Sequence, residues 1–109
     1  MQNPADLPIL TEPIRIALEE LCRKFRVRKL ALFGSATGQS FNPARSDIDI
    51  LVEFLEMPPR EHMENYFGLS EELTQLFHRP VDLVEEVSIK NPYVLASIQK
   101  SQVPVYAAA

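Results

Sequence analysis

The architecture of this chain follows from Phe33-Gly34-Ser35 and, after a loop of eleven residues, from Asp47-Ile48-Asp49-Ile50-Leu51-Val52. An apolar strand ends at a small glycine–serine turn, and a second apolar strand opens with two carboxylates. Because side chains alternate along a strand, we expect Asp47 and Asp49 on the same side. Two like charges held together are costly unless a cation lies near both. The pattern indicates a divalent metal and a turn whose backbone amides bind phosphate.

Apolar spacing predicts further helices and strands on both sides of this stretch. After an irregular arm at residues 1–10, the expected order is a helix, two strands, a helix, a strand, a helix and a terminal segment. Their approximate bounds are Glu12–Phe25, Lys29–Phe33, Asp47–Phe54, Arg60–Phe77 and Val81–Val84, then a helix that begins at Asn91-Pro92, and finally Val103–Tyr106. The terminal segment is either a strand or an apolar stretch offered to another subunit.

The loop between the first two strands limits how these strands can pair. Residues 36–46 are rich in turn-forming residues, whereas a parallel crossover usually needs a dozen or more residues that include a packed helix. Antiparallel or mixed pairing is therefore expected. The predicted fold class is α+β: a small mixed sheet of three to four strands with helices on one face, in a single domain over residues 1–109.

Composition narrows the class of protein. The 109 residues carry a formal net charge of −4, which disfavours extensive nucleic-acid binding because such binding depends on neutralising phosphates. No apolar run reaches the roughly 18 residues of a membrane span, and residues 1–6 do not show the basic and apolar regions typical of a signal peptide, so a cytoplasmic location without membrane contact is expected. The single Cys22 excludes an internal disulfide and lies on the apolar face of the first helix, which predicts a buried thiol.

Three groups of side chains outside the main motif have simpler interpretations. The basic cluster within Arg23–Lys29 is either the solvated end of a helix, where cations complement the helix dipole, or a docking patch for an acidic partner. His62 and His78 have no Cys or His partner at metal-binding spacing, so surface or partly packed histidines are expected. Met63 and the Tyr66-Phe67 pair recur at helical spacing, which favours core packing over a platform for stacking bases.

A third carboxylate strengthens the case for a metal site. Asp82 interrupts the otherwise apolar run Val81–Val84, where a solvated face would not explain it. Other chemistries based on Asp-x-Asp fit less well. An EF-hand loop requires a polar ligand where Leu51 stands and a glycine where Val52 stands. Phosphatases with an aspartyl nucleophile carry the pair at the end of a strand, whereas this strand follows the pair.

With these three carboxylates the chain resembles a known family. Phe33-Gly34-Ser35, the loop, and Ser46–Val52 are similar to the signature of the minimal nucleotidyltransferases in the DNA polymerase beta superfamily. Val81–Val84 resembles the segment that bears the family's third carboxylate, and Val103–Tyr106 resembles its C-terminal end. The similarity covers about residues 12–106. The loop is one residue longer than the ten that are common in the family, and Thr37 stands where the family often has arginine.

The resemblance implies a function and a role for each site residue. Members this small are similar to antitoxins whose partner is a helical HEPN ribonuclease toxin, and they transfer AMP from ATP to a toxin tyrosine in a Mg²⁺-dependent reaction. Asp47 and Asp49 would bind one or two Mg²⁺ ions. Asp82 would complete a second metal position or accept the proton of the incoming hydroxyl. Gly34 and Ser35 would bind the terminal phosphates of ATP.

Two other functions remain open at this point. The chain could be a non-catalytic antitoxin that neutralises the toxin by stoichiometric binding, which the altered loop favours. The presence of all three aspartates favours the enzyme instead. Nucleotide transfer to a small molecule or to RNA is the less favoured third possibility.

Overall fold

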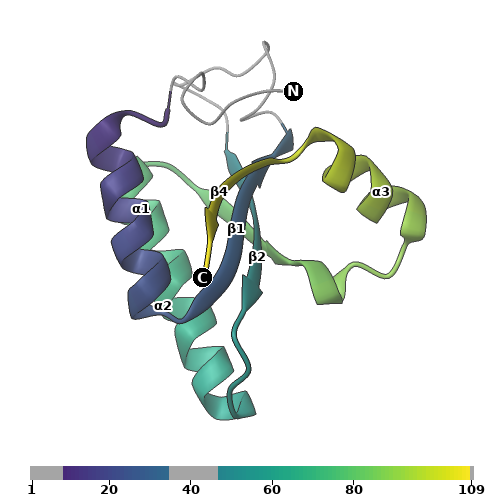
Figure 1. Ribbon diagram of the computed structural model, residues 1–109, viewed down its shortest axis with the longest axis horizontal. Coiled ribbons are helices and arrows are strands. Elements are labelled where there is room, and N and C mark those ends of the chain that lie inside the picture. Colours follow the sequence, from purple (N-terminus) through teal and green to yellow (C-terminus); the bar gives the residue numbers. More distant parts are fainter. Residues whose placement is uncertain (1–8, 35–46, 109) are drawn as a thin grey trace.

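The computed structural model of the protein describes residues 9–34 and 47–108 (Figure 1). In chain order the elements are α1 (Glu12–Lys24), β1 (Val27–Phe33), β2 (Ile48–Phe54), α2 (Pro59–Phe77), β3 (Val81–Glu85), a short 3-10 helix η3 (Glu86–Ser88), α3 (Pro92–Ser101) and β4 (Val103–Ala107). All predicted elements are present, with bounds that differ by only a few residues. Among the described helices, none combines the length and the apolar character that crossing a membrane would require.

The strands form one mixed sheet in the order β3-β2-β1-β4. Strand β1 runs antiparallel to both β2 and β4, whereas β2 and β3 are parallel. This arrangement confirms the predicted α+β fold with a small mixed sheet, and it confirms antiparallel pairing across the loop. The terminal segment is a strand of this sheet, because Leu32 pairs with Val103 and Leu30 with Tyr106.

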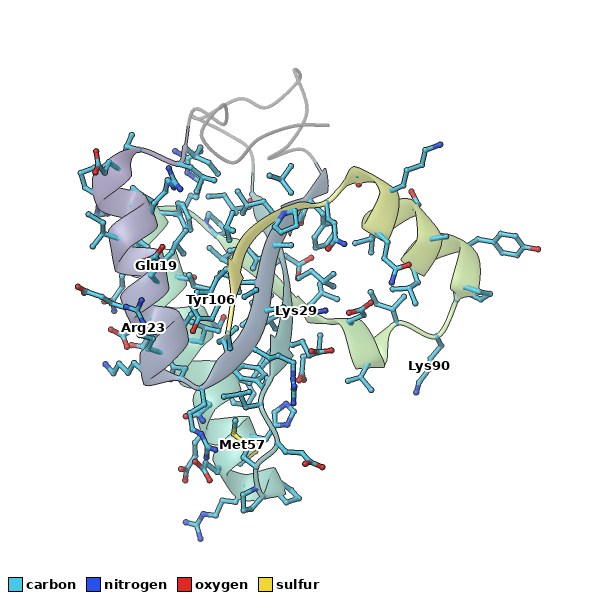
Figure 2. All side chains as sticks on the ribbon, in the orientation of Figure 1. Glu19, Arg23, Lys29, Met57, Lys90 and Tyr106 are labelled. Carbon is cyan, nitrogen blue, oxygen red and sulfur yellow. The ribbon has the colours of Figure 1, made fainter. Side chains whose placement is uncertain are left out.

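The helices do not all lie on one face of the sheet. Helices α1 and α2 cover one face, as predicted, but α3 lies on the other side (Figure 1). Figure 2 shows Lys29 of β1 projecting to this second side. The reason is topological: β3 and β4 are parallel strands at opposite edges of the sheet, so the connection between them must cross a face. Since α1 and α2 occupy the first face, α3 crosses the second.

Helix α3 starts where the sequence predicts. The Asn91 side chain accepts hydrogen bonds from the backbone amides of Tyr93 (2.9 Å) and Val94 (3.3 Å), and Pro92 occupies the first turn. An asparagine cap satisfies amides that have no partner within the helix, and proline lacks the amide that would otherwise need one. No residue of α3 is fully buried, so this helix covers its face of the sheet only loosely.

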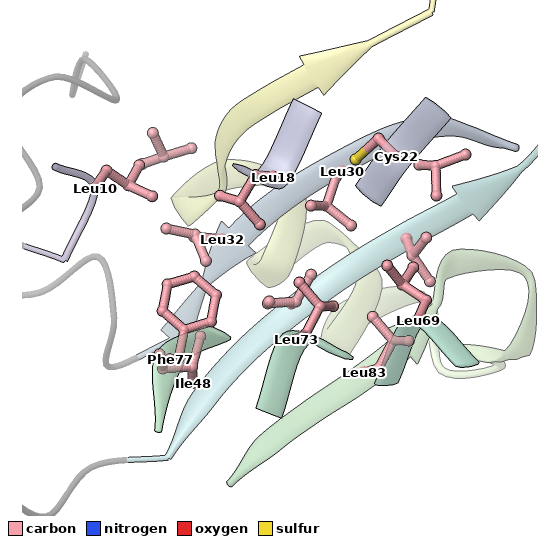
Figure 3. Packing of buried hydrophobic residues seen from close by; sticks show 14 of the residues in the cluster. Leu10, Leu18, Cys22, Leu30, Leu32, Ile48, Leu69, Leu73, Phe77 and Leu83 are labelled. Carbon is pink, nitrogen blue, oxygen red and sulfur yellow. The ribbon is translucent and has the colours of Figure 1, made fainter. Parts of the chain in front are cut away.

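The hydrophobic core lies between the sheet and the two long helices (Figure 3). Along β2, Ile48 and Ile50 are 0% exposed and Val52 is 1% exposed, while the residues between them face the other side. Leu69 and Leu73 of α2 pack against this surface and are also 0% exposed. Strand alternation therefore assigns one face to the core and leaves the opposite face for polar residues.

Part of the predicted packing of α2 is wrong. Tyr66 packs against the core and donates a hydrogen bond from its hydroxyl to the Leu83 carbonyl at 2.5 Å. Met63 and Phe67, however, are 54% and 64% exposed. These exposures show that no other layer of the described fold covers the two side chains. Figure 1 shows that the first turns of α2 extend beyond the strands and α1. Helical spacing identified an apolar stripe but could not show where the covering layer ends.

The buried thiol of Cys22 provides a test of this packing. The side chain is 0% exposed, which confirms the sequence prediction. Burial raises the pKa of Cys22 to about 12 from an ordinary value near 9.0, and Glu19 contributes in the same direction. The folded protein therefore keeps a proton that the unfolded chain releases above about pH 9, so raising the pH favours unfolding. We expect a loss of about 1.4 kcal/mol in unfolding free energy per pH unit between these two values.

The measurement compares wild type with Cys22→Ala by urea denaturation from pH 7 to pH 10.5. Other groups also titrate in this range, so the informative quantity is the difference between the two proteins. Alanine removes the thiol and costs a fixed amount of packing energy at every pH. The advantage of the wild type should therefore shrink above about pH 9. Parallel stability curves would show that the thiol is not buried in the folded state.

Candidate active site

Two aspartates from neighbouring strands lie directly opposite each other. Asp49, the second residue of β2, pairs in register with Asp82 of β3 on one side and with Phe33 of β1 on the other. Residues that pair directly across strands project to the same face of a sheet. This face is the one opposite the core. Asp47 lies two residues before Asp49, and the β2–β3 pairing begins beside it with a bond from the Ile48 amide to the Pro80 carbonyl (3.1 Å).

The electrostatics of Asp49 reflect these neighbours. Burial raises the pKa of the Asp49 carboxyl above its ordinary value, and the charges of Asp82 and then Asp47 raise it further. Asp49 is half-buried, whereas Asp47 and Asp82 are exposed. Burial and like charges both disfavour the ionised carboxylate, and a nearby cation would offset both effects. The three side chains thus form one acidic cluster at the start of β2 and β3.

Gly34 packs against this cluster. Its backbone has a φ of +66°, a conformation that a residue with a side chain adopts only at a cost. A Cβ atom built on Gly34 would collide with Oδ2 of Asp49 and would lie 3.3 Å from its Cγ. Glycine is therefore needed at this turn both for its backbone conformation and for the space that the Asp49 carboxylate fills.

The remaining predicted site residue, Ser35, lies outside the described residues, as do 36–46 with Thr37. The structure thus brings Asp47, Asp49, Asp82 and Gly34 together. Sequence reasoning had no means of identifying the contact between Gly34 and Asp49, because it depends on the register between β1 and β2. The spacing of the motif gave the residue types but not which carboxylate the glycine contacts.

The donor chemistry of the cluster fits a hard divalent cation. Carboxylate oxygens are the ligands that Mg²⁺ prefers, and burial together with the charges of Asp82 and Asp47 raises the pKa of the Asp49 carboxyl, a cost that a bound cation would offset. In the described part of the chain, however, no three acidic, histidine or cysteine side chains are gathered closely enough to hold one ion together. The arrangement presents ligands on adjacent strands rather than a closed metal cage. Such an open site suits a metal that also binds substrate phosphates.

Lys24, Arg26 and His62 each have a partner within the fold. Lys24 pairs with Glu72 at 2.8 Å and Arg26 with Glu61 at 3.1 Å, so much of the charge of the basic cluster is already compensated within the fold. His62 Nε2 bonds to Glu85, which agrees with the prediction of a partly packed histidine. Exposed ion pairs of this kind contribute little to stability, and none of these residues belongs to the acidic cluster.

The sequence is similar to a known family of proteins over most of its length. The model of the nucleotidyltransferase domain family matches residues 14–104. A Methanocaldococcus jannaschii protein named "putative protein adenylyltransferase" is 40% identical over 85 residues, which cover 78% of this chain and 83% of that protein. The protein adenylyltransferase MntA of Thermococcus cleftensis is 38% identical over 74 residues, covering 67% of this chain and 70% of that protein.

Solved structures show the same fold at lower identity. A structure described as a "putative minimal nucleotidyltransferase" has a TM-score of 0.71 and 23% identity, and the match covers 94% of this chain and 96% of that chain. A complex of a tri-AMPylated Shewanella oneidensis HEPN toxin with its MNT antitoxin has a TM-score of 0.61 and 18% identity, covering 89% of this chain and 72% of the matched chain. At these identities the structural likeness concerns the fold.

Proposed function

The chain belongs to the nucleotidyltransferase domain family, and we therefore propose that this enzyme is an adenylyltransferase antitoxin. It transfers AMP from ATP to a tyrosine hydroxyl of a HEPN ribonuclease toxin and so inactivates the toxin. The observation that carries the proposal is the placement of Asp49 between Gly34 and Asp82. It puts a turn whose backbone amides can bind a phosphate group beside two carboxylates on the sheet face opposite the core. Relatives named as protein adenylyltransferases support the choice of AMP as the transferred group.

The proposed reaction is an in-line displacement at the α-phosphorus of ATP. The tyrosine oxygen forms the new bond to phosphorus, the bond to the bridging oxygen breaks, and pyrophosphate leaves. Asp82 is exposed on the outer strand β3, where an incoming protein hydroxyl can reach it, and its carboxylate accepts the hydroxyl proton. Gly34 and Ser35 bind the terminal phosphates. Asp47 and Asp49 would hold one or two Mg²⁺ ions, which supply charge neutralisation for the phosphates and the leaving group.

A purely binding antitoxin is the second candidate, and one feature of the structure favours it. Three large apolar side chains on the segment after β3 are strongly exposed: Val87 by 78%, Tyr93 by 85% and Val94 by 47%. Exposed apolar side chains grouped on one segment are common at sites of protein association. Binding through η3 and α3 would neutralise a toxin without chemistry. It is also compatible with catalysis, because an enzyme that modifies a protein must bind it.

The experiment that tests the proposal uses the purified protein with an active HEPN ribonuclease partner, ATP and Mg²⁺. At one antitoxin per twenty toxin molecules, we expect mass spectrometry to show AMP on a toxin tyrosine and RNA cleavage to stop. The control is a toxin in which that tyrosine is replaced by phenylalanine, which should remain unmodified and active. Inhibition only at equimolar ratio, without a change in toxin mass, would exclude the enzymatic proposal and leave the binding one.

A further inference from the structure

The N-terminal half of α2 carries a pair of exposed apolar side chains. Met63 and Phe67 are about one helical turn apart and are 54% and 64% exposed. The Phe67 ring lies edge-on to the ring of Tyr66, with 5.3 Å between the ring centroids, and Tyr66 packs against the core. The exposed ring is therefore supported from behind by the folded protein. Large apolar side chains gathered on one helix face are common at sites of protein association.

Opposite charges flank this pair, one turn away on each side. Arg60 precedes Met63 by three residues, and Glu71 follows Phe67 by four. At 3.6 residues per turn, these four side chains fall within an arc of about 80° around the helix. All four are exposed, and we call them the outer face of α2. This face points away from Leu69, which is 0% exposed in the core.

The order of the four residues is self-complementary. When two copies of a helix pack antiparallel about a two-fold axis, residues at equal distances on either side of the axis meet each other. The midpoint between Met63 and Phe67 lies half a residue from the midpoint between Arg60 and Glu71. Half a residue is less than about 1 Å along a helix. A single axis therefore sets Met63 against Phe67 of the second copy and Arg60 against Glu71 of the second copy.

We infer that the outer face of α2 is an interface between two copies of this chain, packed antiparallel about a two-fold axis. A different protein is the weaker assignment, because one helix already supplies both halves of the apolar contact and both halves of the charged contact. The first turns of α2 extend beyond the strands and α1 (Figure 1), which leaves room for a second copy. The acidic cluster lies on the opposite face of the sheet, so each copy keeps it accessible.

The expected dimer is weak. One helix face from each copy is a small contact, and interfaces at the low end of the size range are typical of transient association. We expect a dissociation constant on the order of 10 μM. Arg60 also pairs with Glu64 of its own helix at 3.5 Å, but an exposed pair of this kind contributes little. It does not hold Arg60 away from a second copy.

The first test measures self-association of the full chain by sedimentation velocity, at concentrations from about 1 to about 300 μM. Wild type should show a monomer–dimer equilibrium. Phe67→Ala should weaken it at least about tenfold, because the two-fold axis makes each lost contact count twice. The matched control is Ile16→Ala, which truncates an apolar side chain of α1 that is 52% exposed and should leave the equilibrium unchanged. Thermal unfolding of the same samples checks that both variants are folded.

The second test reverses charges. Arg60→Glu alone places acidic side chains against each other at both ends of the interface, so dimerisation should weaken about tenfold. The double variant Arg60→Glu/Glu71→Arg exchanges the two charges and should restore the wild-type dissociation constant. The double variant Arg60→Glu/Glu20→Arg has the same net charge, but its second change lies on α1, where Glu20 is exposed. It should remain as weak as Arg60→Glu.

A monomeric wild type over the whole concentration range would overturn the inference, as would equal dissociation constants for the two double variants. If wild type is monomeric and Phe67→Ala prevents binding of the HEPN ribonuclease partner, the outer face of α2 belongs to that partner instead. AMP transfer by Phe67→Ala should equal that of wild type. The proposed function is therefore tested separately: a dimer without transfer would contradict the proposed function alone, and transfer by a strict monomer would contradict this inference alone.

Discussion

Asp49→Asn will reduce AMP transfer at least about a hundredfold and will leave the fold intact. Asparagine has nearly the same shape but carries no charge, so it is a poor ligand for a divalent cation and cannot neutralise it. Removing an electrostatic contact to a transferring group costs about 10²–10³ in rate. The charge of Asp49 is disfavoured in the folded protein by burial and by Asp82 and Asp47. The melting temperature of the variant should therefore equal or exceed that of wild type.

The measurement pairs single-turnover transfer of labelled AMP with thermal unfolding of the same samples. Glu56→Gln provides a matched control, because Glu56 is exposed two residues beyond the end of β2 and the substitution removes the same charge. This control should retain full transfer activity. If Asp49→Asn transfers AMP as fast as wild type, Asp49 is not part of the proposed site. A large loss of stability in Asp49→Asn would show that its role is structural.

The second large effect is expected for Gly34→Ala. Gly34 has a φ of +66°, and alanine in this conformation costs about 1–2 kcal/mol in backbone strain. Its Cβ would also collide with Oδ2 of Asp49, so the carboxylate must move or the turn must open. Displacing a reacting group by about 1 Å can reduce the rate about a hundredfold. We expect transfer per folded molecule to fall about that much, while the unfolding free energy falls by only about 1–3 kcal/mol.

Gly68 is the matched control for this prediction. A Cβ at Gly68 in α2 would meet the Phe25 ring, with 2.7 Å to Cε1, so this glycine also allows a close approach. Here the crowded group is a half-buried ring that packs α1 against α2, far from the acidic cluster. Alanine gains helix propensity at this position and displaces the ring. Gly68→Ala should change stability modestly in either direction and leave transfer per folded molecule unchanged. Equal losses of transfer in both variants would show that the Gly34 effect is not specific to the site.

The spacing of apolar residues was sufficient to predict the helices and strands. It was not sufficient to predict which of their side chains other parts of the fold cover. Strand β2 is recognisable because apolar residues alternate with Asp49 and Glu53, and α3 because Asn91-Pro92 is a strong helix start. The burial of Met63 and Phe67 was predicted wrongly, since an apolar stripe on a helix does not show whether another layer covers it. The third helix lies across the opposite face because of strand order, and strand order depends on contacts between residues distant in sequence.

Local sequence alone specified which residue types meet near the start of β2, because alternation and turn chemistry act over only a few residues. It specified the α+β class for the same reason. The fold in three dimensions was needed to place Asp82 opposite Asp49 and to bring Gly34 into contact with the Asp49 carboxylate. Each of these contacts joins segments separated along the chain, and their registers are set by core packing on the other face of the sheet.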